Sequence, residues 1–127
     1  MKKVWTNGCY DVLHVGHIAL FEYAKSLGDQ LIVGIDSDKR VKKLKGQDRP
    51  FNNELNRKRM LESIKYIDKV FIFDTTDQMC NILEYNLLDV MVIGEEYRNK
   101  PITGKHLVDQ VVFFPRLGEH STSRILK

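Results

Sequence analysis

Two histidines stand three positions apart in the segment of residues 6–17, which reads TNGCYDVLHVGH. If a helix begins here, the rings of His14 and His17 can face the same side of its first turn. Imidazole N–H groups in that place can donate hydrogen bonds to a phosphate whose negative charge grows during a displacement reaction. The segment is therefore a candidate site for phosphate chemistry.

Glycines in the same segment strengthen this interpretation. Backbone N–H groups at the start of a helix, together with the positive end of its dipole, favour anions. Gly8 and Gly16 allow the backbone to approach a phosphate closely. The alternative is that both histidines lie on the helix surface and that Gly16 has no role. That interpretation does not explain why two histidines and two glycines occur together at this position. The sequence contains neither a Walker A loop nor G-x-G-x-x-G, so the predicted nucleotide site is of another kind.

The elements around this segment alternate between strand and helix patterns. Residues 31–35 form an uninterrupted apolar run, which is typical of a parallel strand buried on both faces. Five strands alternating with helices predict one α/β domain over residues 1–127, with a Rossmann-like, doubly wound, five-stranded parallel sheet. In that architecture, ligands bind beyond the carboxyl ends of the strands. The predicted strands are 3–7, 31–35, 70–73, 89–93 and 110–114, and the predicted helices are 15–27, 54–67, 77–85 and 121–127.

Composition narrows the class of protein. The chain has 127 residues, of which 43% are hydrophobic and 29% charged, as in an ordinary globular domain. A net charge of +3 does not predict a nucleic-acid binder. No apolar run approaches the roughly 20 residues that span a bilayer, so no membrane partner is expected. Cys9 and Cys80 form no disulfide framework, which favours reduced thiols and a cytoplasmic location.

With the motif H-x-G-H at His14 to His17, the chain resembles the cytidylyltransferase-like family of nucleotidyltransferases over almost its whole length. Such enzymes transfer a nucleoside monophosphate from a nucleoside triphosphate to a phosphorylated sugar or polyol and release pyrophosphate. The resemblance implies AMP transfer to D-glycero-D-manno-heptose 1-phosphate, with CMP transfer to glycerol 3-phosphate as the alternative. The first rests on residues 7–11, 44–46, 49–50 and 53–57, the second on residues 93–97 and on chain length.

The resemblance also implies roles for individual residues. The implied catalytic residues are His14, His17, Lys45 and Arg116. The implied nucleotide-binding residues are Asn7, Gly8, Cys9, Tyr10, Gly16, His17, Gly94, Ser121, Thr122 and Ser123. Asp11, Lys43 and Arg57 are implied to contact the acceptor. No residue is assigned to a metal; Mg²⁺ is expected to enter with the triphosphate, held by phosphate and water.

The basic stretch of residues 39–49 is interpreted in two parts. Lys43 and Lys45 are predicted to lie on the loop that follows the second strand, and Lys45, within Leu-Lys-Gly, is the preferred phosphate contact. Lys39, Arg40 and Lys42 are assigned to a solvated charged face, which is what most charge runs are.

Other interpretations stay open at this point. Glu95 and Glu96 follow the fourth predicted strand and could hold a cation through water, contact an acceptor hydroxyl or form a plain acidic loop. The serine pair around Thr122 could be an ordinary helix cap. A nucleotide-sensing module without turnover is a second functional class, although the intact motif favours an enzyme. The resemblance also implies a homodimer.

Overall fold

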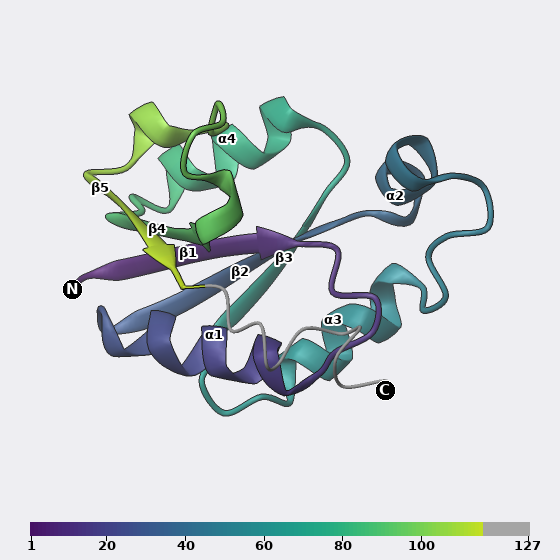
Figure 1. Ribbon diagram of the computed structural model, residues 1–127, viewed down its shortest axis with the longest axis horizontal. Coiled ribbons are helices and arrows are strands. Elements are labelled where there is room, and N and C mark those ends of the chain that lie inside the picture. Colours follow the sequence, from purple (N-terminus) through teal and green to yellow (C-terminus); the bar gives the residue numbers. More distant parts are fainter. Residues whose placement is uncertain (116–127) are drawn as a thin grey trace.

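The computed structural model describes residues 1–115, which fold around one parallel sheet (Figure 1). The strands follow the order β3-β2-β1-β4-β5. The chain adds β2 and β3 on one side of β1 and then adds β4 and β5 on the other side, so the strand order reverses between β1 and β4. This confirms the predicted fold class. The predicted helix 121–127 lies outside the described residues. The elements are β1 (Lys3–Gly8), α1 (Val15–Ser26), β2 (Gln30–Asp36), α2 (Asp38–Lys45), α3 (Glu54–Glu62), β3 (Lys69–Phe73), α4 (Thr76–Tyr85), β4 (Val90–Gly94), the 3₁₀ helices η1 (Glu95–Tyr97) and η2 (Lys105–Leu107), and β5 (Gln110–Phe114).

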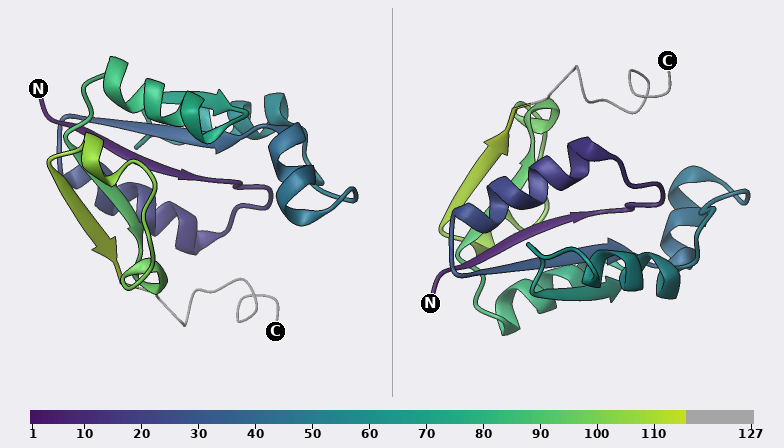
Figure 2. Two further views of the ribbon diagram at one scale, coloured as in Figure 1. Left: turned by 90° about the horizontal axis from the view of Figure 1, so that it is seen from above. Right: turned by 90° about the horizontal axis from the view of Figure 1, so that it is seen from below.

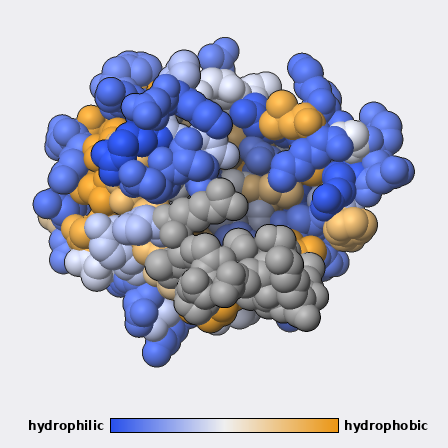
Figure 3. All heavy atoms as spheres, in the orientation of Figure 1, coloured by the Kyte–Doolittle hydropathy of each residue, from blue (hydrophilic) through white to orange (hydrophobic). Residues whose placement is uncertain are grey.

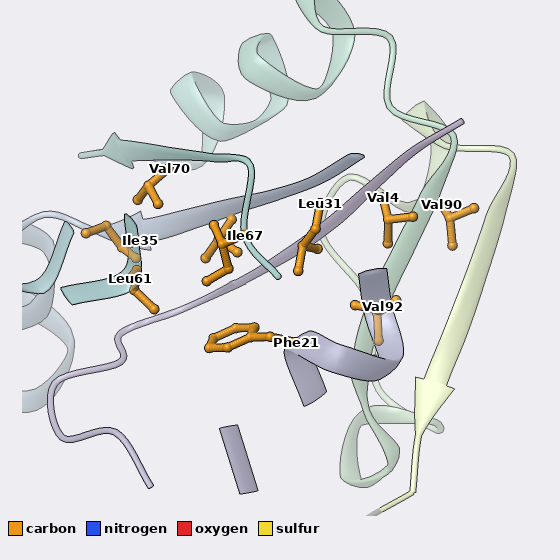
Figure 4. Close-up of a cluster of buried hydrophobic side chains, with 11 residues drawn as sticks. Val4, Phe21, Leu31, Ile35, Leu61, Ile67, Val70, Val90 and Val92 are labelled. Atoms are coloured by element: carbon orange, nitrogen blue, oxygen red, sulfur yellow. The ribbon is translucent and has the colours of Figure 1, made fainter. Parts of the chain in front are cut away.

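The sheet has a hydrophobic core on each face because its strands alternate their side chains between the two. Val4 of β1 and Leu31 of β2 pack with Phe21 of α1 and with α3 on one face (Figure 4). The next residues along the strands, Trp5 and Ile32, pack against α4 on the other face. The opposite views of Figure 2 show these helix layers. Both faces are therefore covered, as the apolar strand sequences require.

The face of the molecule seen in Figure 3 is mainly polar among the described residues. In the view of Figure 3, hydrophilic side chains dominate the described surface, and apolar side chains appear as separate small patches. No helix within residues 1–115 combines the length and apolar character needed to cross a bilayer.

Helix α2 was not expected, because Lys43 and Lys45 were predicted to lie on a loop. Ser37 caps the helix by accepting a hydrogen bond from the N–H of Arg40, and Gly46 ends it with a φ of 108°. Only Val41 of this helix is buried, so the sequence lacks the apolar periodicity that reveals most helices. Lys43 and Lys45 consequently lie in the last turn of a helix, where positive charges complement its dipole.

Helix α3 also differs from its prediction. It ends at Glu62 rather than at residue 67. Two apolar residues of the helical pattern, Leu55 and Met60, are 69% and 47% exposed. The buried face is formed instead by Arg57 and Leu61, four positions apart. A charged residue thus occupies half of the buried face of this helix.

Replacement of Gly34 by alanine tests the close packing of β2 on β1. A Cβ atom at Gly34 would overlap the Trp5 ring, with Cζ2 of that fully buried ring only 2.5 Å away. We expect Gly34→Ala to lower the free energy of unfolding by about 1–3 kcal/mol in urea titration. Trp5→Phe removes the overlapping atoms, so Gly34→Ala should lower the free energy of unfolding less in the Trp5→Phe protein. An equal loss of free energy in both proteins would contradict the overlap.

Candidate active site

A cavity of about 660 Å³ opens beyond the carboxyl ends of β1 and β4, where the chain reverses across the sheet. Open α/β sheets bind their ligands at this place. Many of the residues that were singled out from the sequence meet in its wall. These are Asn7, Gly8, Cys9, Tyr10, His14, Gly16, His17, Lys45, Gly94 and Glu96. Four others, Arg116, Ser121, Thr122 and Ser123, lie outside the described residues.

Tyr10 shapes the loop that connects β1 to α1. Its backbone has a φ of 50°, in the left-handed region that non-glycine residues rarely adopt. Its ring lies over Gly8, where a Cβ atom would be 3.0 Å from the ring carbon Cζ. The ring also packs edge-on against His17 and Phe21, with centroid distances of 5.4 and 5.3 Å. Burial raises the pKa of the Tyr10 hydroxyl, so Tyr10 stays neutral and supports the His17 ring.

His14 and His17 together form a capping box at the start of α1. Nδ1 of His14 accepts a hydrogen bond from the N–H of Gly16 at 3.0 Å, and Nδ1 of His17 accepts from the N–H of His14 at 3.1 Å. A ring nitrogen that accepts a hydrogen bond carries no proton, so each neutral ring carries its proton on Nε2. The ring centroids are 4.0 Å apart, and both rings line the cavity. The cap therefore leaves two Nε2–H donors for a ligand.

Both histidines are neutral at pH 7. Burial lowers the pKa of His14, and burial together with the neighbouring His14 lowers the pKa of His17 to about 4. A phosphate beside the rings would favour their charged forms and raise these values. The free site thus presents two neutral Nε2–H donors, and protonation of either Nδ1 would break a hydrogen bond of the cap.

The lowered pKa of His17 predicts a pH-dependent stability. Unfolded histidine, with a pKa of 6.5, binds protons more readily than buried His17, so the free energy of unfolding must fall as the pH drops from 6.5 toward 4. After a discount for solvent screening we expect a loss of roughly 1–2 kcal/mol. Urea titrations between pH 4 and 7 measure it.

His17→Asn provides the control for this pH dependence, because asparagine does not titrate. The variant should lose much of the slope in this interval. The carboxyl of Asp11, whose pKa is lowered from 3.8, is present in both proteins, so its effect cancels in the comparison. The same slope in both proteins would mean that His17 is not buried in its neutral form.

Asp11 connects the histidine loop to the segment before α3. Its carboxylate accepts hydrogen bonds from the N–H groups of Phe51 and Asn52, both at 2.7 Å. Its Oδ2 atom also lies 3.7 Å from Nη1 of Arg49. Burial opposes ionisation, but these donors and the nearby arginines outweigh it and lower the pKa of Asp11. In the structure the carboxylate holds protein backbone rather than facing the cavity. Its predicted contact with an acceptor stays a prediction.

Arg57 is placed differently from its predicted role. Its side chain has no exposed surface, and its guanidinium donates to backbone carbonyls and to Asp38. A contact with the acceptor phosphate would need an exposed N–H group, which this arrangement does not offer. The burial of Arg57 could not be foreseen from its type, because arginine is usually exposed.

The positive charges of the cavity come from α2. Lys45 lines the wall and lies close enough to Cys9 to oppose the effect of burial, which raises the pKa of that thiol. Arg40 also lines the wall and pairs with Asp36 at 3.0 Å, so its assignment to a solvated face is wrong. Asp36 is the last residue of β2, and Arg40 follows it by four positions. This spacing from a strand end could have indicated that Arg40 lies at the cavity. Lys43 is exposed and is not part of the wall.

The two glutamates after β4 point to different places. Glu95 accepts two hydrogen bonds from Arg98, at 2.6 and 2.8 Å, and this pairing lowers its pKa. The carboxylate of Glu96 instead folds over Gly94, where it would overlap a Cβ atom, and lines the cavity. Within residues 1–115, no group of three or more His, Cys, Asp or Glu side chains could hold a metal ion.

An apolar wall of the cavity was missed by sequence reasoning. It is formed by side chains from α4, from β4 and from the segment before η2, namely Met79, Met91, Ile93 and Ile102. Their sequence pattern is that of ordinary core residues, so no local signal marks them. An apolar wall in a cavity that also holds polar donors is suited to the base of a nucleotide.

Comparison with known proteins gives a consistent result. The profile of the cytidylyltransferase-like family matches residues 5–124. The chain is 42% identical over 126 residues to the bifunctional protein HldE of Campylobacter jejuni strain RM1221, and 40% identical to that of Helicobacter hepaticus. These matches cover 99% of this chain but only 27% and 26% of the relatives, so the chain spans about a quarter of their length.

A solved structure shares the fold. The lipopolysaccharide core biosynthesis protein from Thermoplasma volcanium GSS1 superimposes with a TM-score of 0.73 at 26% sequence identity. The alignment covers 90% of this chain and 97% of that one. The described sheet and its helices therefore form an arrangement that also occurs in that protein.

Proposed function

Because the chain belongs to the cytidylyltransferase-like family of nucleotidyltransferases, we propose that it transfers AMP from ATP to a phosphorylated sugar such as heptose 1-phosphate. The observation that carries this proposal is the pair of Nε2–H donors of His14 and His17 in the wall of the cavity. The relatives named HldE and the lipopolysaccharide core biosynthesis protein support a sugar phosphate as the acceptor.

The proposed reaction is a direct in-line displacement. A phosphate oxygen of the acceptor attacks the α-phosphorus of ATP, and the bond from that phosphorus to the bridging oxygen of the β-phosphate breaks. Pyrophosphate leaves with the bonding electrons. His14 and His17 donate hydrogen bonds to the developing charge, and Lys45 supplies a fixed positive charge nearby. Positioning and charge stabilisation suffice, so no covalent nucleophile is required.

Mg²⁺ is proposed to enter as part of the nucleotide substrate. The phosphates and water supply most of its ligands in such sites. Of the residues described at the cavity, Glu96 offers an oxygen ligand for that cation or for a sugar hydroxyl. The ion would neutralise the triphosphate and the departing pyrophosphate.

A pyrophosphate-release assay tests the proposed function. ATP, CTP, GTP and UTP are each combined with heptose 1-phosphate, glycerol 3-phosphate and other sugar phosphates in the presence of Mg²⁺. We expect release with ATP and a sugar phosphate. Release with CTP and glycerol 3-phosphate instead would establish the cytidylyltransferase alternative. Nucleotide binding without turnover would favour a sensing module, and no nucleotide binding would contradict the proposal.

We also propose that the protein works as a homodimer in the cytoplasm. Apolar side chains are exposed around the starts of α1 and α3: Val12, Val15, Phe51 and Leu55 are 55–69% exposed. Burial of such side chains favours association. The free thiols of Cys9 and Cys80 fit a reducing compartment. Light scattering at several concentrations measures the association, and a strictly monomeric protein would contradict the dimer.

A further inference from the structure

Arg57 is a charged side chain buried within the described part of the chain, with 1% of the residue exposed. Its Nε donates to the carbonyl of Asn52 at 2.9 Å. Nη1 donates to the carbonyls of Cys9 at 3.0 Å and Asp36 at 2.7 Å, and Nη2 donates to Oδ1 of Asp38 at 2.9 Å. These bonds satisfy most of the five N–H groups of the guanidinium.

The acceptors come from three parts of the chain that are distant in the sequence, around residues 9, 36–38 and 52. Cys9 belongs to the loop after β1, Asp36 ends β2, Asp38 begins α2, and Asn52 precedes α3. Figures 1 and 2 show these segments gathered at one end of the sheet. A buried charge is unfavourable unless it is paired and hydrogen-bonded. The planar fork of arginine donates to all four acceptors, whereas a lysine ammonium has only three N–H donors.

One of these bonds holds the peptide directly before a strained residue. The Cys9 carbonyl belongs to the Cys9–Tyr10 peptide, and Tyr10 has a φ of 50°. Such a conformation persists when the surrounding structure fixes it. On the other side of Tyr10, the Asp11 carboxylate is held by the N–H groups of Phe51 and Asn52. The strained peptide is thus fixed on both sides.

The same arrangement reaches the histidines. The Tyr10 ring packs edge-on against His17, so its direction decides where that imidazole can lie. A second connection leads to α2, because Arg57 pairs with Asp38 in its first turn and Glu54 accepts a hydrogen bond from the N–H of Asp38 at 2.8 Å. Helix α2 carries Lys45 to the cavity wall.

We propose that Arg57 is a positioning residue: it holds the Cys9–Tyr10 peptide so that the Tyr10 ring fixes His17, and it holds the helix that carries Lys45. The catalytic consequence rests on the proposed function, whereas the effect on the His17 ring does not. Arg57 itself touches no reacting atom.

Arg57→Lys is the decisive variant, because it keeps the positive charge and loses the fork. We expect kcat to fall about a hundredfold, the effect of a displacement of about 1 Å at reacting groups, while KM changes less than threefold. Arg59→Lys is the matched control, since Arg59 is exposed on the same helix. It should keep the activity of the wild type.

A spectroscopic readout separates positioning from loss of stability. NMR titration of the His17 ring in the substrate-free protein should show its pKa rising toward 6.5 in Arg57→Lys, because a released Tyr10 ring exposes the imidazole to water. Val70→Ala truncates the core at β3, away from the cavity wall. This control lowers stability and should leave the His17 titration unchanged.

The outcomes distinguish the two proposals. If the wild type transfers no nucleotide, the proposed function fails, and the His17 titration still tests Arg57. An unchanged His17 titration in folded Arg57→Lys overturns the positioning role, even if kcat falls. If Arg57→Lys does not fold, Asp38→Asn removes only the charged partner and should shift the titration in the same direction by less. No shift in that variant also overturns the proposal.

Discussion

Replacement of His17 by asparagine is expected to lower kcat by about 100- to 1,000-fold, the effect of removing one donor to a developing charge. The amide oxygen of asparagine reaches the place of Nδ1, so it can keep accepting the hydrogen bond from the N–H of His14. Nothing replaces the Nε2–H group. The cap of α1 therefore survives, and the thermal unfolding midpoint should stay near that of the wild type.

His17→Gln is the matched control for this prediction. The longer glutamine amide reaches the place of Nε2 and can donate there, but it loses the acceptor at Nδ1. We expect an activity between those of the wild type and His17→Asn, with a larger loss of stability, because the N–H of His14 is left without its partner. Wild-type turnover in His17→Asn, measured by pyrophosphate release, would exclude the Nε2–H donor from the mechanism.

The strands were predictable because each carries its signal in consecutive residues. A parallel strand buried on both faces, such as β2, reads as an apolar run. Helix α2 carries no such signal, since one buried valine and several lysines resemble a solvated loop. The buried face of α3 was hidden for a related reason: Arg57, rather than an apolar residue, faces the interior in the first half of that helix.

The same distinction holds for the site: residues that are adjacent in the sequence could be predicted, and residues that only the fold brings together could not. Residues 6–17 could be interpreted together because strand end, loop and helix start are adjacent in the sequence. Arg40 and the apolar wall reach the cavity only through the crossover connections, which bring α2 and α4 to it from distant positions. Asp11 and Arg57 were recognised by type, but their bonds to backbone groups depend on loop geometry.

The second large effect is expected at Lys45. Lys45→Met keeps most of the apolar stem and removes the charge, so kcat/KM should fall roughly 10- to 100-fold, as for the loss of one contact to a phosphate. The residue lies at the end of α2, in the wall of the cavity. Its charge also opposes the effect of burial on the pKa of Cys9, in the loop that precedes the histidines.

Lys42→Met is the control for Lys45→Met, because Lys42 lies in the same last turn and outside the cavity wall. Both variants remove a charge that favours the helix dipole, so their unfolding midpoints should move equally. Lys45→Arg should recover part of the activity. If Lys42→Met and Lys45→Met lost activity equally, the effect would come from the net charge of α2. Arg40, held in the wall by Asp36, would then be the cation that meets the phosphate.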